Sequence, residues 1–133
     1  MTPWPVADFS RQHSAGANLE FSIRTDSEFD SLTVRFTQYK EGAAWQWRNM
    51  VEICTSKGGS SDINFAADGQ WHRVSIPLSK FYIHGTQGDW KDAPGAGDEG
   101  FAWDCINHIE FVPEGNGNLV GKTIYLDNIR IRK

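Results

Sequence analysis

The chain has 133 residues, 39% of them hydrophobic and 23% charged, a size and balance typical of one globular domain. Its formal net charge is −4 and its basic residues are scattered, which argues against nucleic acid or an anionic membrane as the partner. No apolar run approaches the roughly 20 residues of a membrane helix, and the opening MTPWPVADF lacks the charged-then-apolar pattern of a signal peptide. We therefore expect a single domain over residues 1–133 that binds neither nucleic acid nor membranes.

Alternating hydrophobic and polar residues indicate a series of strands in the first half of the chain. Residues 1–17 are mixed and suggest an arm that leads into the first strand. From Leu19 to Arg24 every second residue is hydrophobic, which is the pattern of a half-buried strand, and turn signals separate this run from later ones. The pattern predicts strands at residues 19–24, 32–37, 44–55 and 63–65.

The second half of the chain continues the same rhythm. It predicts strands at residues 71–78 (WHRVSIPL), 106–112 (INHIEFV) and 122–132 (KTIYLDNIRIR). In the last of these, the hydrophobic positions change parity between Leu126 and Ile129. This change predicts a β-bulge around Asp127 and Asn128.

Several short strands separated by turns, with no helical period of ten residues, indicate an all-β sandwich or barrel. The inward-facing strand positions should form its core. They are Leu19, Phe21, Ile23, Leu32, Val34, Phe36, Val51, Ile53, Val74, Ile76, Ile109, Phe111, Ile124, Leu126 and Ile129.

The long segment from Phe81 to Cys105 is the most unusual stretch of the sequence. It carries two of the six tryptophans, Trp90 and Trp103, and five of the 13 glycines. Loops of this length in compact domains are usually functional or disordered, and disordered segments are poor in aromatic residues. We interpret the segment as an ordered functional loop, with core plugging by its tryptophans as the alternative.

The two cysteines and four histidines match no zinc-binding spacing, so we predict no metal site from them. Cys54 and Cys105 either form one disulfide or lie as buried thiols near strands, and the sequence leaves both alternatives open.

Three stretches carry a resemblance to a known family. GQWHRVSIPLSKF matches a pattern G-x-W-x-x-V-x-I-P-L-S-x-F, INHIEF matches I-x-x-I-x-F, and the chain closes on GKTIYLDNIRI. Together they resemble the β-jelly-roll carbohydrate-binding modules that are appended to glycoside hydrolases acting on plant cell walls.

The resemblance implies a jelly roll of two antiparallel sheets whose concave face holds a β-linked chain such as β-glucan, xyloglucan, cellulose or glucomannan. It also implies a secreted protein that works as part of a modular enzyme. Trp71 corresponds to a packing tryptophan of the family. In similar modules an aspartate like Asp127 often helps bind a structural calcium, for which Asp8 and Glu20 are the acids available in the N-terminal region. The alternative is that Asp127 only stabilises the bulge.

Sugar recognition explains the aromatic content independently of the resemblance. The flat C–H faces of a pyranose ring fit an indole or phenol ring, and its hydroxyl groups need polar side chains nearby. Two clusters combine both kinds of residue, one at the start of the third predicted strand with Tyr39 nearby, and one in the long segment. The candidate carbohydrate-binding residues are Tyr39, Trp45, Gln46, Trp47, Arg48, Tyr82, Gln87, Trp90, Trp103 and Tyr125.

Strand parity leaves the orientation of the first cluster open. Trp45 and Trp47 share a face with Val51 and Ile53, which is the core side of a regular strand. Either a bulge near Asn49 turns them outward, or they cap the core. Tyr125 alternates with hydrophobic neighbours and should face outward, either as a ligand contact or as a solvated surface residue.

Catalysis is not expected. A glycosidase needs two carboxyl groups about 5–10 Å apart, and although acids are plentiful, none lies in a catalytic motif. Glu52 and Glu110 lie on strands, where solvated surface acids are the simpler interpretation. The hypotheses are therefore a non-catalytic carbohydrate-binding module, a protein-interaction or structural β-sandwich, and a small polysaccharide-degrading enzyme, in that order.

Overall fold

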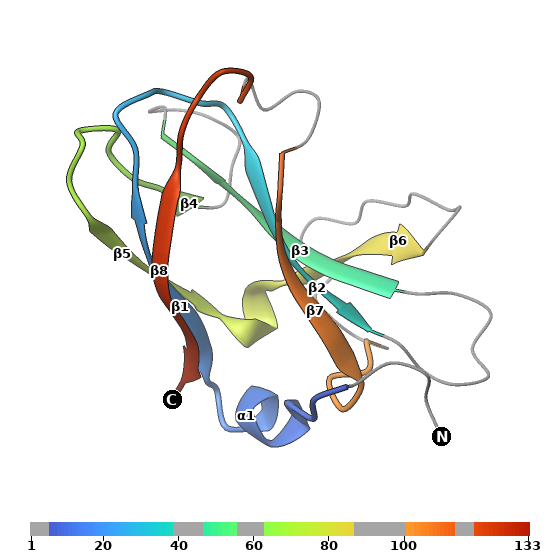
Figure 1. The fold of residues 1–133 in the computed structure, drawn as a ribbon. Helices are drawn as coiled ribbons and strands as arrows, with labels where there is room; N and C mark the ends of the chain where they lie inside the picture. The colour runs from blue at the N-terminus through green and yellow to red at the C-terminus, as the bar shows by residue number, and fades with distance from the viewer. Residues whose placement is uncertain (1–5, 39–46, 56–62, 87–100, 114–118) are drawn as a thin grey trace.

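The computed structural model describes residues 6–38, 47–55, 63–86, 101–113 and 119–133, and it describes only the backbone at 47–50, 52 and 82–86. Strands make up most of this part of the chain (Figure 1). The elements in chain order are α1 (Ser10–Ser14), β1 (Asn18–Arg24), β2 (Leu32–Gln38), β3 (Trp47–Cys54), β4 (Ile63–Asn64), β5 (His72–Pro77), the 3-10 turn η1 (Leu78–Lys80), β6 (Tyr82–Thr86), β7 (Ile106–Val112) and β8 (Tyr125–Arg132).

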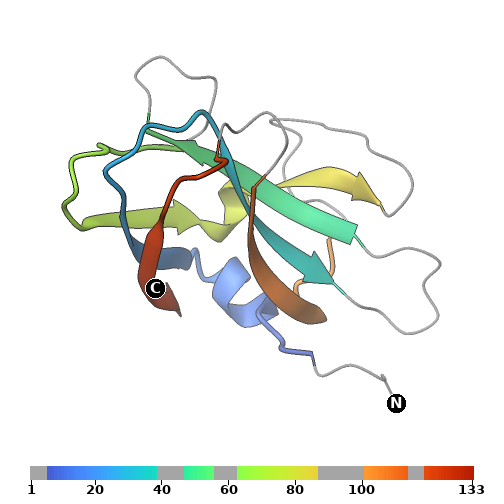
Figure 2. The ribbon, with the colours of Figure 1, turned by 45° about the horizontal axis from the view of Figure 1, so that its top comes forward.

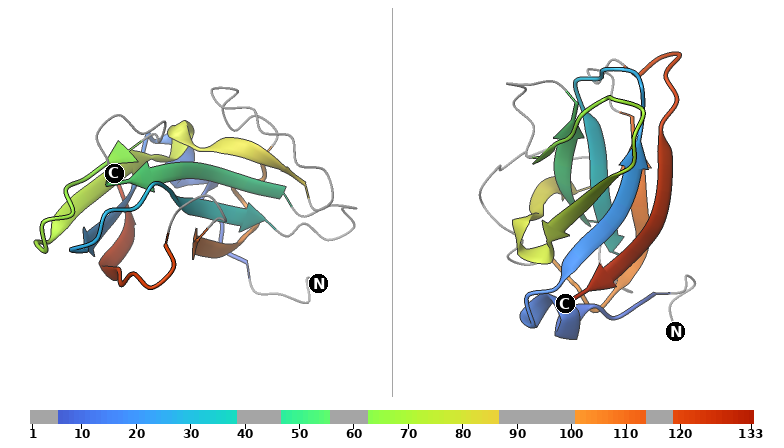
Figure 3. Two further views of the ribbon diagram at one scale, coloured as in Figure 1. Left: turned by 90° about the horizontal axis from the view of Figure 1, so that it is seen from above. Right: turned by 90° about the vertical axis from the view of Figure 1, so that its left-hand side faces the viewer.

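The strands form two sheets. One has three strands in the order β5-β1-β8, and the other has five, with β4-β3-β2-β7 in line and β6 also paired to β3. All pairs are antiparallel except β3 with β4. The sheets lie face to face, with the three-stranded sheet nearer the viewer in the right panel of Figure 3. The predicted all-β sandwich is therefore confirmed.

The core between the sheets follows the predicted alternation closely. Leu19, Phe21 and Ile23 of β1 are at most 1% exposed, while the residues between them face outward. Ten of the predicted core residues are buried, and four more lie partly buried against them. The prediction for Ile129 was wrong, because this residue is 47% exposed.

The exposure of Ile129 is explained by the predicted bulge, which is confirmed. On β8 two residues, Asn128 and Ile129, lie opposite the single residue Phe21, and Asn128 has a positive φ of 53°. The backbone N–H of Asn128 donates a hydrogen bond to Asp127 Oδ1 at 2.8 Å, which holds the turn of the chain there. Ile129 therefore lies in the bulge, where regular alternation does not apply.

The helix α1 and the strand β6 were not predicted. The helix α1 lies at the end of the sandwich where the C-terminus is found, within the segment expected to be an arm (Figures 1 and 2). The strand β6 lies within the segment expected to be a long loop, directly after the fully buried Phe81. Five residues each are too few to show a helical or strand period clearly.

Cys54, which the sequence left open between a disulfide and a buried thiol, is buried at the end of β3. Its Sγ donates a hydrogen bond to Asn64 Oδ1 of the parallel neighbour β4, 2.6 Å away. Within the described residues, no helix has the length and apolar character needed to cross a membrane.

Candidate functional site

A row of positions crosses the outer face of the five-stranded sheet. Because β2 buries Val34 and Phe36 in the core, alternation places Arg35 on the opposite face. Directly opposed residues of an antiparallel pair share a face. The register therefore gives a transverse row of four positions, which are Glu110 on β7, Arg35 on β2, Met50 on β3 and Tyr82 on β6. The predicted site residue Tyr82 thus occupies a position of this row, although its side chain lies outside the described part.

Polar side chains contact one another along β2 and β7. Arg35 Nε donates to Glu110 Oε1 at 2.8 Å, with the two side chains 15% and 35% exposed. One step along the strands, Thr37 Oγ1 donates to Asn107 Oδ1 at 2.6 Å and lies 3.4 Å from His108 Nδ1. These groups supply both donors and acceptors, as sugar hydroxyls require. We call the transverse row together with Thr37, Asn107 and His108 the polar face.

The two predicted aromatic clusters begin at the same end of this sheet. Trp47, the first residue of β3, lies opposite Thr86, the last residue of β6, and Arg48 lies opposite both Gly85 and Thr37. The segments 39–46 and 87–100 therefore start from neighbouring strand ends. Those segments contain five candidates that lie outside the described residues, namely Tyr39, Trp45, Gln46, Gln87 and Trp90.

The pairing of β2 with β3 indicates which face of the sheet the position of Trp47 belongs to. The register runs without a break from Leu32 opposite Ile53 to Thr37 opposite Arg48. The bulge proposed near Asn49 is therefore absent from this pairing, and the irregularity there belongs to the pairing of β3 with β6. Alternation places the backbone position of Trp47 on the core side and that of Arg48 on the polar face, whereas their side chains lie outside the described part.

Trp103 occupies the core. It is 5% exposed, and the imidazole ring of His13 stacks on it with centroids 4.9 Å apart. Phe36 and Phe101 approach it edge-on at 5.0 and 5.1 Å. Of the two alternatives that the sequence offered for Trp103, the structure shows the core one, so we leave this residue out of the proposed site.

Tyr125 and Trp71 lie on the other sheet. Tyr125 begins β8 and is 49% exposed, so it faces outward as predicted. Trp71 was expected to pack in the core. This prediction was wrong, because the residue lies just before β5 and its side chain is 47% exposed. The Arg24 guanidinium lies over both rings, with Cζ 5.3 Å from the Trp71 centroid and 4.6 Å from the Tyr125 centroid. Sequence reasoning missed Arg24.

The three acids considered as calcium ligands each accept hydrogen bonds from different residues. Asp127 accepts the bulge hydrogen bond from Asn128, and Asp8 accepts hydrogen bonds from Ser10. Glu20 accepts from Arg73 at 2.9 Å and from Arg130 at 3.2 Å, and these bonds hold the pKa of Glu20 below its ordinary range, that from Arg73 having the larger effect. Across the described ranges, no group of three or more His, Cys, Asp or Glu side chains is placed to hold a metal.

The fold is a β-sandwich with a hydrogen-bonding sheet surface, and two aromatic-bearing segments adjoin strand ends at one end of that sheet. A comparison with protein-family models identifies the class of domain. The family described as Carbohydrate binding domain 30 matches residues 1–133, so the chain belongs to this family of non-catalytic carbohydrate-binding domains. Searches of curated proteins and of solved structures gave no match.

Proposed function

We propose that this domain binds β-linked plant cell-wall polysaccharides, with β-glucan, xyloglucan, cellulose and glucomannan as the candidate ligands. The ligand chain would lie on the polar face and against the aromatic residues of the two adjoining segments. The observation that carries the proposal is the pairing of Trp47 with Thr86, which brings the starting points of both predicted clusters together. In this proposal the aromatic residues of both segments supply the stacking surfaces and the polar face supplies the hydroxyl partners.

The dimensions of the polar face suit an extended ligand. Adjacent strands lie about 4.8 Å apart, so a row crossing four strands covers roughly 14 Å. Such a span exceeds one sugar ring and favours a chain over a monosaccharide. Across the row, two charged residues are followed by one apolar and one aromatic residue.

The charges of the polar face favour a neutral ligand. Arg35 and Glu110 neutralise each other, and each retains hydrogen-bonding capacity beyond their shared contact. An acidic polysaccharide would meet the Glu110 carboxylate and would have to compete with it for Arg35. Neutral glucans and mannans satisfy both groups through hydroxyls.

We further propose that the domain is secreted and directs an attached glycoside hydrolase to its substrate. The support for this is the resemblance of the GQWHRVSIPLSKF and GKTIYLDNIRI stretches to modules attached to such enzymes. In this arrangement the hydrolase supplies the chemistry and the domain raises the local concentration of enzyme on the polysaccharide.

Affinity gel electrophoresis tests the proposed ligand class. The domain is run through gels containing xyloglucan, mixed-linkage β-glucan, hydroxyethylcellulose or glucomannan, with pectin and an α-glucan as controls. Retardation by at least one of the four neutral β-linked polymers, but not by the controls, is expected. Unchanged mobility in all four would contradict the proposal and favour the protein-interaction hypothesis. Release of reducing sugar from any polymer would indicate an enzyme instead.

A further inference from the structure

An exposed aromatic pair lies on the outer face of the three-stranded sheet, away from the polar face. Arg24 lies opposite Tyr125 in the pairing of β1 with β8, and its guanidinium is held between the rings of Tyr125 and Trp71. Both rings are about half exposed, at 49% and 47%. Contact with two aromatic faces holds a guanidinium in place while its edge remains available for hydrogen bonds.

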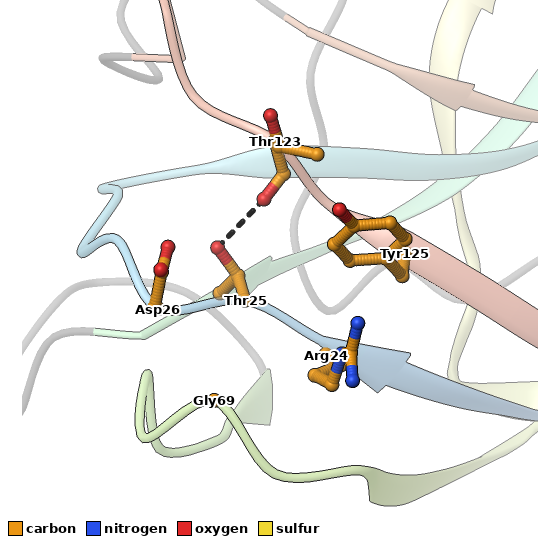
Figure 4. A pocket seen from close by; sticks show the side chains of 6 residues that line it. All are labelled: Arg24, Thr25, Asp26, Gly69, Thr123 and Tyr125. Atoms are coloured by element: carbon orange, nitrogen blue, oxygen red, sulfur yellow. Dashed lines mark hydrogen bonds between the residues drawn. The ribbon is translucent and has the colours of Figure 1, made fainter.

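A pocket of about 290 Å³ adjoins this cluster. Its walls come from the end of β1, the turn before β5 and the residues that lead into β8 (Figure 4). Hydrogen bonds tie the walls together, since Thr25 Oγ1 donates to the Thr123 carbonyl at 2.9 Å and Gly69 N donates to the Thr25 carbonyl at 3.0 Å. Thr25 itself is 1% exposed, so the pocket is supported by buried structure. The lining residues are Arg24, Thr25, Asp26, Gly69, Thr123 and Tyr125.

The polar groups of this pocket retain most of their hydrogen-bonding capacity. Within the described residues, neither the Arg24 guanidinium nor the Tyr125 hydroxyl makes a hydrogen bond, and Asp26 has one weak contact, 3.3 Å from Ser27 Oγ. Arg24 and Asp26 line the same pocket without forming an ion pair. In Figure 4 the Tyr125 hydroxyl points towards Thr25 and Thr123, above the Arg24 side chain. A donor and an acceptor thus face a space large enough for a small polar ligand.

From this arrangement we infer a second saccharide site, which binds one neutral sugar residue, either a single ring or the end of a chain. Arg24 donates to one hydroxyl and Asp26 accepts from another, while Tyr125 supplies a third polar contact through its own hydroxyl. The part of the Tyr125 ring that lines the pocket covers a C–H face of the sugar, while Trp71 lies outside the lining and holds the Arg24 guanidinium in place. The opposite charges of Arg24 and Asp26 favour a neutral sugar over a uronic acid.

This site is independent of the polar face, because it lies on the other sheet. Its volume, at the lower end of the roughly 300–1,000 Å³ common for small-molecule pockets, suits one ring better than an extended chain. A domain with both sites contacts two stretches of polysaccharide at once, which increases its retention on an insoluble surface.

A titration of the ¹⁵N-labelled domain with cellobiose, followed by NMR, tests the second site. The backbone amides of Thr25, Gly69 and Thr123 and the indole N–H of Trp71 should shift and approach saturation. Asp26→Asn and Tyr125→Phe preserve the side-chain shapes and should each weaken binding at these signals roughly 2- to 10-fold. Val120→Ala removes an exposed apolar side chain outside the pocket and should leave the affinity unchanged.

The same spectra report on binding at the pocket and binding at the polar face through different signals. The amides of Thr37 and Glu110 report on the polar face, and their response does not depend on the pocket. If they shift with a longer cello-oligosaccharide while the pocket signals stay still in excess cellobiose, the second site is contradicted and the proposed function stands. Pocket signals that shift identically in the parent, Asp26→Asn and Tyr125→Phe would also contradict it. Saturable pocket shifts without any response of the polar face would support the second site and count against the proposed function.

Discussion

Trp47 lies opposite Thr86 in the antiparallel pairing of β3 with β6. These residues are 39 positions apart in the sequence, and each adjoins a segment with a predicted sugar-stacking tryptophan. The pairing depends on β6, a short strand that sequence reasoning placed inside a loop. Once β6 is recognised, the strand ends that lead into the two candidate clusters lie next to each other beside the polar face.

Replacing Trp103 with alanine should destabilise the domain without directly affecting the ligand surface. Its ring is buried and in contact with Phe36, Phe101 and His13, so its removal leaves a large cavity. The expected loss in the free energy of unfolding is about 3–5 kcal/mol, measured by urea denaturation. A loss under about 1 kcal/mol would show that the indole does not pack as described.

The ion pair of Arg35 with Glu110 should matter more for binding than for stability. Exposed or partly exposed pairs contribute roughly 0–1 kcal/mol to folding. Glu110→Gln keeps the shape but weakens the hold on Arg35, so we expect a several-fold lower affinity for the soluble β-glucan and little change in melting temperature. Val120→Ala, at a fully exposed side chain outside the polar face, serves as the control. An affinity equal to that of the parent would show that this ion pair does not contribute to ligand binding.

Glu20 should make stability depend on pH. Its pKa is lowered from an ordinary value of 4.5, chiefly by the hydrogen bond from Arg73, so the unfolded chain takes up the proton more readily than the folded domain. This contribution is fully present above the unfolded pKa and is lost as pH falls through the lower folded pKa. The melting temperature of the parent should exceed that of Glu20→Gln at about pH 6, and the difference should shrink towards about pH 3. A difference that is constant over this range would contradict the assignment.

Binding should be nearly independent of salt, because a neutral polysaccharide releases no counterions. We expect less than about a twofold change in affinity between roughly 50 and 200 mM sodium chloride, measured by calorimetric titration. A fall of about tenfold would indicate an acidic ligand held by basic side chains.

The sandwich and most of its core could be predicted because alternation in strands is a local pattern. The residues of β1 and β5 show it without interruption, β2 shows it except at the buried Thr33, and the parity change near Asp127 located the bulge correctly. Inside the bulge the same rule failed for Ile129, because an extra residue breaks the alternation.

The positions of the aromatic residues could not be predicted in the same way. Trp71 and Trp103 were judged from strand position and loop context, but the structure exposes the first and buries the second. Trp71 lies just before β5 begins, so strand alternation does not govern it. Trp103 packs against Phe36 and Phe101 and also against His13 of α1, an element too short to recognise. Long-range contacts of this kind leave no periodic signal in the sequence.

We propose that glycan binds beside the polar face, where the segment that follows Thr86 and the segment that precedes Trp47 adjoin it. The most direct measurement is a calorimetric titration of the parent and Trp90→Ala with the soluble polysaccharide that is retained most strongly in the gels. By analogy with base–aromatic stacking, a lost stacking contact is worth about 1–3 kcal/mol, so the affinity of Trp90→Ala should fall about 5- to 150-fold while its melting temperature changes by only a few degrees. A folded Trp90→Ala variant that binds as tightly as the parent would contradict the claim.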